Sequence, residues 1–187
     1  MHVMKNAEFP TLPIFGVRMI LREDMRNVNY IGMGPYESYA DKHHASWHGS
    51  FSASIDEMHE DYIMPQENGS HFDCSYVQIG SLMENDIKTD MSAHSITMTS
   101  AVPFSMNASP YTAEELTVAT HNYELPESDK SVLCIDYRQN GIGSNSCGPL
   151  PMDKYKVILR EPVEFTLVLT PYNRQSGEAL RRMRILP

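Results

Sequence analysis

The sequence predicts an all-β sandwich with one short helix, and three observations support this prediction. First, about eight segments alternate apolar and polar residues, which is the pattern of strands with one buried face. Second, clusters of glycine, proline, asparagine and aspartate separate these segments, as in the turns of antiparallel sheets. Third, a single segment begins with a helix-capping sequence and continues at helical spacing.

The overall composition is that of a globular protein. With 187 residues, 41% of them hydrophobic and 21% charged, the chain is long enough to bury a core, and we expect a single domain over residues 1–187. The net charge of −9 argues against nucleic acid and anionic membranes as partners. No segment is apolar for long enough to span a bilayer, and Met1–Lys5 lacks the features of a signal peptide.

Three cysteines bear on the cellular compartment. Cys74, Cys134 and Cys147 are odd in number and widely spaced. This spacing argues against a disulfide framework and against a zinc site of the CxxC type. We therefore expect a reducing, cytoplasmic environment.

The first strands follow from alternation. In Phe15–Arg22 the apolar residues share one parity, which predicts a half-buried strand, and Val28–Met33 resumes the extended pattern until Gly34-Pro35 ends it. In His44–Ile55 one parity is rich in serine and histidine, and the other includes Trp47 and Phe51. This segment predicts a strand with one solvent-exposed face and with Trp47 in the core.

Three histidines near this strand raise the alternative of a metal-binding module. His43, His44 and His48 lie close together in sequence. Two of them fall on the serine-rich face, however, and no carboxylate or thiolate lies between them. Because a metal needs convergent ligands, we expect no metal in this chain.

The segment Asp61–Ser70 is a polar turn between two alternating segments. Pro65 ends an apolar run, and Asn68-Gly69 supplies residues that tolerate a positive φ. On spacing alone, a polar hairpin loop is the favoured interpretation.

Later strands carry local irregularities. In His71–Ser81 the apolar residues change parity, which predicts a bulge or a strand buried on both faces. Ser95–Met106 contains Pro103, so we expect an edge position or a break. Ser131–Arg138 has apolar residues on both parities and is expected to be central.

One helix and two further strands complete the prediction. Thr112-Ala113-Glu114-Glu115 is a capping box, so both glutamates have a structural task at the helix N-terminus. Tyr155–Arg160 and Val163–Thr170 are predicted strands, and the tail over 173–187 is expected to be a short helix or an unordered end.

The usual catalytic signatures are missing from the sequence. It contains no Gly-x-Ser-x-Gly, no His-Glu-x-x-His and no glycine-rich dinucleotide turn. Gln139–Pro149 is rich in glycine, but it lacks the Gly-Lys-Ser/Thr of a phosphate-binding loop. Cys147 lacks a nearby basic partner that would activate its thiol. A long shaped loop at the edge of a sheet is what the pattern predicts.

Four blocks, in order, give the chain a family resemblance. They are Gly34–Lys42 (GPYESYADK), Tyr62–Gly69 (YIMPQENG), Pro110–His121, and Gly141–Pro149 followed by Tyr155. In this order they resemble the C-terminal domain of glycoside hydrolase family 2 β-galactosidases. Four ordered blocks are far more specific than any one motif.

The resemblance implies a fold, an activity of the parent enzyme, and a location of its catalytic residues outside this chain. The fold would be the second half of a galactose-mutarotase-like supersandwich in a long retaining enzyme. The catalytic glutamates of that family lie in an (α/β)₈ barrel, so no residue here inherits a catalytic role. No cofactor is expected in this fragment, and any magnesium or sodium ion would belong to the parent enzyme. Its expected partners are the remaining domains of the parent and the galactoside substrate.

The resemblance also indicates a substrate-binding loop. In well-studied members the loop matching Gly141–Pro149 carries a tryptophan that packs against bound sugar. Here the segment is one residue shorter and Ser146-Cys147 stand at that place. The resemblance therefore implies Asn145, Ser146 and Cys147 as the substrate-contacting residues.

Three further expectations follow. Glu67, together with Gln66 and Asn68, is expected to fix this turn against a neighbouring strand or domain through side-chain hydrogen bonds. An incomplete supersandwich leaves unpaired edges, so we expect the fragment to self-associate. The alternative function is a carbohydrate-binding module that acts alone.

Overall fold

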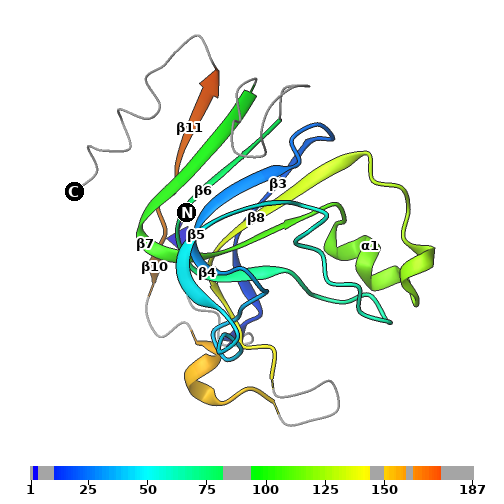
Figure 1. Ribbon diagram of the computed structural model, residues 1–187. Coiled ribbons are helices and arrows are strands. Elements are labelled where there is room, and N and C mark those ends of the chain that lie inside the picture. Colours follow the sequence, from blue (N-terminus) through cyan, green and yellow to red (C-terminus); the bar gives the residue numbers. More distant parts are fainter. Residues whose placement is uncertain (1, 4–10, 82–93, 144–149, 159–161, 174–187) are drawn as a thin grey trace.

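The structure is a computed structural model that describes residues 2–3, 11–81, 94–143, 150–158 and 162–173. The fold is all-β and sandwich-like, built around a seven-stranded antiparallel sheet in the order β3-β8-β7-β6-β4-β5, with β11 paired to β7 (Figure 1). The strands of this sheet are β3 (Ile14–Arg22), β4 (Asn27–Gly34), β5 (Trp47–Ser54), β6 (Ser70–Gly80), β7 (His94–Ser109), β8 (Lys130–Gln139) and β11 (Val168–Asn173).

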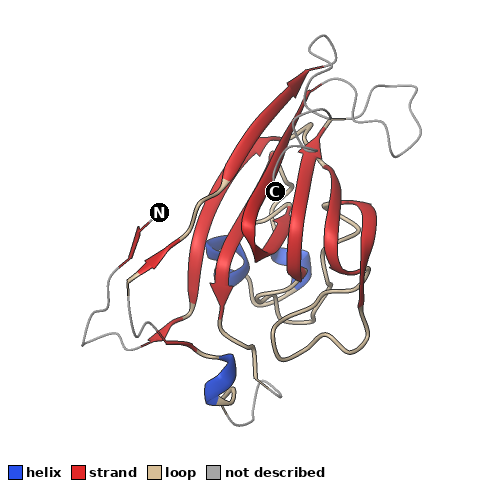
Figure 2. Cartoon of the chain, turned by 90° about the vertical axis from the view of Figure 1, so that its left-hand side faces the viewer, coloured by secondary structure: helices blue, strands red, loops and turns tan. Residues whose placement is uncertain are grey.

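Short elements complete the described chain. Two two-stranded sheets pair β1 (His2–Val3) with β10 (Val163–Glu164) and β2 (Thr11–Leu12) with β9 (Val157–Ile158). The helical elements are α1 (Ala113–Val118) and the 3₁₀ turns η1 (Asn122–Glu124) and η2 (Asp153–Tyr155). Figure 2 shows the strands as one curved layer with the helical segments beside it. Among the described residues, no helix has both the length and the apolar character needed to cross a membrane.

The core lies against one face of the large sheet. Leu133 and Ile135 of β8 are fully buried in it, together with residues of β4, β6 and β7. Because side chains alternate along a strand, Val132, Cys134 and Asp136 point to the opposite face. Helix α1 covers that opposite face, since its Leu116 lines the same cavity as these three residues.

Several predicted elements are confirmed. Phe15–Arg22 and Val28–Met33 lie within β3 and β4, and β8 is central, between β3 and β7. The parity change in His71–Ser81 is a bulge, because the register with β7 shifts on both sides of Cys74 and Asp73 has a φ of 56°.

Strand β7 runs through Pro103 without ending. Residues 94–99 pair with β11, and residues 105–109 pair with β8. Among the described strands, residues 100–103 have no register partner. The proline therefore lies where the strand changes neighbour and where its missing N–H costs no hydrogen bond. The predicted edge position or break of the strand is wrong, because β7 is a continuous inner strand and only its pairing is interrupted.

The prediction that Trp47 lies in the core is wrong, because its side chain is 57% exposed. The strand begins at Trp47 rather than at His44, and Trp47 lies opposite Gly34. A glycine offers no side chain to cover the indole, and β5 is at the edge of the sheet. Further along, Phe51 packs against the core while Ser50 is exposed, so the predicted alternation holds there.

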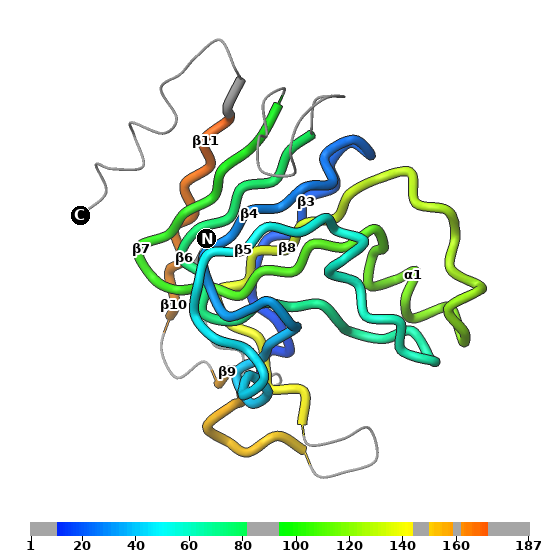
Figure 3. Tube along the Cα trace, viewed as in Figure 1, coloured from blue at the N-terminus to red at the C-terminus, as the bar shows by residue number. Residues whose placement is uncertain are grey.

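The hairpin interpretation of Asp61–Ser70 is also wrong. Strand β4 pairs with β5 on one side and with β6 on the other, so β5 and β6 are not neighbours. The segment over 55–69 therefore crosses from the edge strand to a central one, as Figure 3 shows. Sequence proximity favours a hairpin between β5 and β6, but β4 lies between them and pairs with both.

The C-terminal strands differ from the prediction as well. Tyr155 belongs to η2, Lys156 caps it, β9 has two residues, and residues 159–160 of the predicted Tyr155–Arg160 strand lie outside the described residues. Val163–Thr170 is split into β10 and the start of β11. Phe165 lies in this interruption, where its side chain is 1% exposed and its ring centroid is 5.5 Å from that of Tyr137. The tail over 174–187 is outside the described residues.

Candidate functional site

The carboxylate of Glu37 is the most heavily bonded group in the first sequence block. Its side chain is 7% exposed and accepts hydrogen bonds at Oε1 from Lys42 Nζ and the Tyr62 hydroxyl. The Gly69 N–H donates to Oε2 at 2.9 Å. Burial alone would raise the pKa of this carboxyl, but the three donors outweigh burial and lower it. Glu37 thereby joins the first block to the second.

Glu67 bridges two elements. Its Oε1 accepts a hydrogen bond from Gln139 Nε2 at the end of β8 (3.2 Å) and a longer one from the buried Tyr39 hydroxyl (3.5 Å). Burial raises the pKa of the Glu67 carboxyl, and the nearby Glu37 acts in the same direction. The expectation that Glu67 fixes its turn against a neighbouring strand is therefore confirmed.

The rest of the second block holds its own backbone. Asn68 Oδ1 accepts the Glu60 N–H at 3.0 Å, and Asn68 Nδ2 donates to the Gln66 carbonyl at 2.9 Å. Gly69 has a φ of 67°, and a Cβ there would lie 2.4 Å from the Met58 carbonyl oxygen. Glycine is required at this position for both reasons.

Asp41 clamps the base of the fourth block. Its Oδ1 accepts the Ile142 N–H at 3.1 Å and its Oδ2 accepts the Gly143 N–H at 2.9 Å. Gly141 donates its N–H to the Tyr155 carbonyl at 2.7 Å. A side chain at Gly141 would meet Asp41 Oδ2 at 2.4 Å. The first block therefore positions the start of the loop that follows β8.

We call Glu37, Tyr39, Asp41, Glu67 and Asn68 the motif cluster. Three of the four sequence blocks meet in it, although they are far apart in the chain. The residues predicted to contact substrate, Asn145, Ser146 and Cys147, lie outside the described residues. Sequence reasoning missed the role of Asp41, for which the Gly34–Lys42 block was the available signal.

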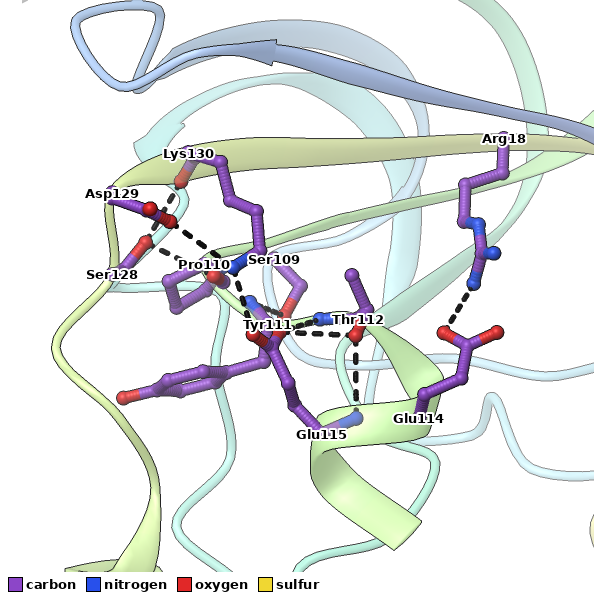
Figure 4. Close-up of polar contacts among 10 residues, drawn as sticks. All are labelled: Arg18, Ser109, Pro110, Tyr111, Thr112, Glu114, Glu115, Ser128, Asp129 and Lys130. Carbon is purple, nitrogen blue, oxygen red and sulfur yellow. Dashed lines mark hydrogen bonds and ion pairs between the residues drawn. The ribbon is translucent and has the colours of Figure 1, made fainter. Parts of the chain in front are cut away.

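The third block forms α1, and its capping box is confirmed. Thr112 Oγ1 accepts the Glu115 N–H at 3.2 Å, while Glu115 Oε2 accepts the Thr112 N–H at 2.8 Å (Figure 4). Glu115 also pairs with Lys130 of β8 at 2.7 Å, and Glu114 pairs with Arg18 of β3 at 2.6 Å. Both glutamates therefore have structural roles, as predicted.

A cavity of about 280 Å³ lies between α1, the turn at 67–68 and the sheet. Its polar lining includes Glu67, Asn107 and Asp136, and its apolar lining includes Ile14 and Leu116. The cavity thus adjoins the motif cluster through Glu67.

His43, His44 and His48 do not form a metal-binding arrangement with acidic or thiol side chains among the described residues. The rings of His43 and His44 stack at 5.1 Å, and His43 Nδ1 lies 2.9 Å from the Tyr39 carbonyl oxygen. Within the described part of the chain, no three histidine, cysteine, aspartate or glutamate side chains are grouped as metal ligands.

Comparison with known proteins shows that this chain is similar to β-galactosidases and which family it belongs to. It is 43% identical over 175 residues to a β-galactosidase of Actinobacillus pleuropneumoniae, covering 93% of this chain and 16% of the relative. It is 35% identical over 165 residues to a β-galactosidase of Staphylococcus xylosus, covering 88% of this chain and 16% of the relative. A β-galactosidase of Arthrobacter sp. strain B7 is 32% identical over 157 residues, or 84% of this chain and 15% of the relative. More narrowly, residues 1–169 match the family "Beta galactosidase small chain", and the chain belongs to that family.

Proposed function

We propose that this chain is the C-terminal part of a retaining β-galactosidase of glycoside hydrolase family 2, and that it supplies structure and one loop rather than the catalytic groups. The named relatives are β-galactosidases about six times as long, of which the chain spans 16% in the first two cases. The described acids of the motif cluster support this division, because Glu37 and Asp41 bind backbone N–H groups. A retaining mechanism needs two carboxyl groups that face the glycosidic bond.

The observation that carries the proposed role is the clamp of Asp41 on Ile142 and Gly143. It fixes the direction in which the chain leaves β8 toward residues 144–149. We propose that this loop borders the substrate site of the parent enzyme, where Asn145, Ser146 and Cys147 contact the galactoside.

Kinetics of the assembled parent enzyme test this role. The substitution Asp41→Ala removes both acceptors, and we expect kcat/KM for a chromogenic β-galactoside to fall roughly tenfold, chiefly through KM, because a misplaced loop weakens substrate positioning. Asp24→Asn, on the β3–β4 turn, is the matched control because it also removes one negative charge. Unchanged kinetics in a folded Asp41→Ala enzyme would contradict the proposal.

One observation favours the alternative function, a carbohydrate-binding module that acts alone. Trp47 is 57% exposed and Tyr36 is 60% exposed, and aromatic faces suit the C–H surface of sugars. Titration calorimetry of the isolated chain with galactose distinguishes the two functions. Saturable binding that Trp47→Ala abolishes would support the module; no heat of binding would dismiss it.

The proposed partners are the remaining domains of the parent enzyme, with which the chain would complete the supersandwich. Two edges of the sheet are suited to this contact, because β3 and β5 each have a single neighbour among the described strands. We propose that the isolated fragment self-associates through these edges, and light scattering over a concentration series tests this. We also propose a cytoplasmic parent, in keeping with the free thiols of Cys74 and Cys134.

A further inference from the structure

Asp136 is a buried residue whose carboxylate faces the cavity and has no hydrogen-bonding partner among the described residues. The residue is 5% exposed, and no N–H or O–H group of the described residues donates to its side chain. A Cβ on Gly16 would lie 1.9 Å from Asp136 Oδ1, so the carboxylate packs directly over the backbone of β3. An unpaired carboxylate in such a place is costly, and buried charges in proteins are normally paired.

The carboxylate of Asp136 lines the 280 Å³ cavity together with a second acid, Glu67. The hydrogen bonds to Glu67 come from the neutral groups of Tyr39 and Gln139, so they bring no positive charge. The residue Glu67 as a whole is exposed, although protein atoms surround its carboxylate, and it gives the cavity an acidic side. The other walls are largely apolar and include Ile14, Val17, Leu116 and Val132.

The described cations near the cavity are already paired with other acids. Arg18 lines the cavity, but its guanidinium binds Glu114 at 2.6 Å (Figure 4). Lys130 binds Glu115 at 2.7 Å. Among the described residues, the two acids of the cavity are therefore left without a cation of their own.

We propose that this cavity is a binding site for an organic cation, namely a primary ammonium group on a short apolar stem. The ammonium would donate hydrogen bonds to the carboxylates of Asp136 and Glu67, and the stem would lie against the apolar walls. A neutral sugar would leave the carboxylates uncompensated. A metal ion would find two carboxylates where a stable site needs more ligands.

The protonation of Asp136 makes the proposal quantitative. Burial, reinforced by the charge of Glu67, raises the pKa of Asp136 to about 7. Of the other groups that face it, Cys134 and Tyr111 do not lose a proton near neutral pH because burial raises their pKa values, and neither does Arg18, whose pKa the ion pair with Glu114 raises. Burial also raises the pKa of Glu67, so any change in its ionisation acts in the same direction as that of Asp136. A cation that binds the ionised form should therefore bind about tenfold more tightly at pH 8 than at pH 6.

The first experiment is a titration of the 187-residue chain with n-butylammonium. Binding is measured by calorimetry and by changes in the NMR signals of the backbone amides of β8. We expect saturable binding with the tenfold pH dependence, and no comparable binding of 1-butanol or galactose. Equal binding of either neutral probe, or binding of the cation without pH dependence, would overturn the proposal.

Variants locate the binding. Asp136→Asn should abolish binding, whereas Asp24→Asn, which changes the net charge equally at an exposed position, should leave it intact. If Asp136→Asn does not fold, Glu67→Gln serves instead, because its side chain is solvent-accessible, and it should weaken binding severalfold. Full binding by Glu67→Gln and by a folded Asp136→Asn would overturn the assignment.

The cation could be a free amine or a lysine side chain from the rest of the parent enzyme. Only this choice of source rests on the proposed function. If free butylammonium binds the assembled parent as well as the isolated chain, the ligand is a free amine. If the parent excludes it and Asp136→Asn lowers the parent's Tm, a lysine occupies the cavity. If free butylammonium does not bind the parent and Asp136→Asn leaves the Tm of the parent unchanged, the proposal is overturned for the parent. Turnover of a galactoside tests the proposed function separately.

Discussion

Replacing Glu37 by Gln is expected to destabilise the fold substantially. The carboxylate is 7% exposed and accepts hydrogen bonds from Lys42, Tyr62 and Gly69. Glutamine keeps one acceptor oxygen but turns an NH₂ group toward a donor, and it removes the charge opposite Lys42. Hydrogen bonds to a charged group contribute about 1.5–3 kcal/mol, and the 49% exposure of Lys42 screens its share. We expect a loss of about 2–3 kcal/mol in the free energy of unfolding.

Urea denaturation of the 187-residue chain measures this loss, with Glu127→Gln at an exposed position as control. The control should stay within about 0.5 kcal/mol of the unsubstituted chain. Because the folded-state pKa of Glu37 is lowered, its stabilisation is present above the ordinary value of 4.5 and is lost as the pH falls through the folded value. The two chains should thus converge in acid. A loss below about 0.5 kcal/mol at pH 7 would refute the reasoning.

Three further predictions concern the fold. Burial lowers the pKa of His71 to about 4, so the neutral form of its side chain stabilises the fold fully above pH 6.5. The free energy of unfolding should therefore decrease by up to about 3 kcal/mol as the pH falls from 6.5 to 4. In urea denaturation at a series of pH values, His71→Gln should remove that part of the decrease. Gly69→Ala should cost about 1–3 kcal/mol by denaturation, because of its φ of 67° and the nearby Met58 carbonyl; an unchanged midpoint would contradict this. Thr112→Ala should cost about 1 kcal/mol by removing the cap of α1, whereas the exposed Thr117→Ala should cost less.

Local signals in the sequence predict local structure here. The capping box at Thr112 and the parity change in β6 each depend on residues within a few positions, and the structure confirms them. The central position of β8 follows from apolar residues on both faces. Such features are set by backbone sterics and by burial, which neighbouring residues already determine.

Contacts between residues that are far apart in the chain explain the features that could not be predicted from the sequence. Trp47 is exposed because Gly34 lies opposite it, and no pattern within β5 contains that information. Asp41 and Ile142 are 101 residues apart, so their contact requires the fold. Asp136 lies against Gly16 because of the register between β3 and β8, which shifts between Phe15 and Gly16.

The most direct test of the account measures hydrolysis of a chromogenic β-galactoside by the 187-residue chain, by the remainder of the parent enzyme and by the two together. We expect no turnover by the chain alone, and turnover when both parts are present. Turnover by the isolated chain above a mock preparation, abolished by a substitution within it, would contradict the claim that the catalytic groups lie elsewhere.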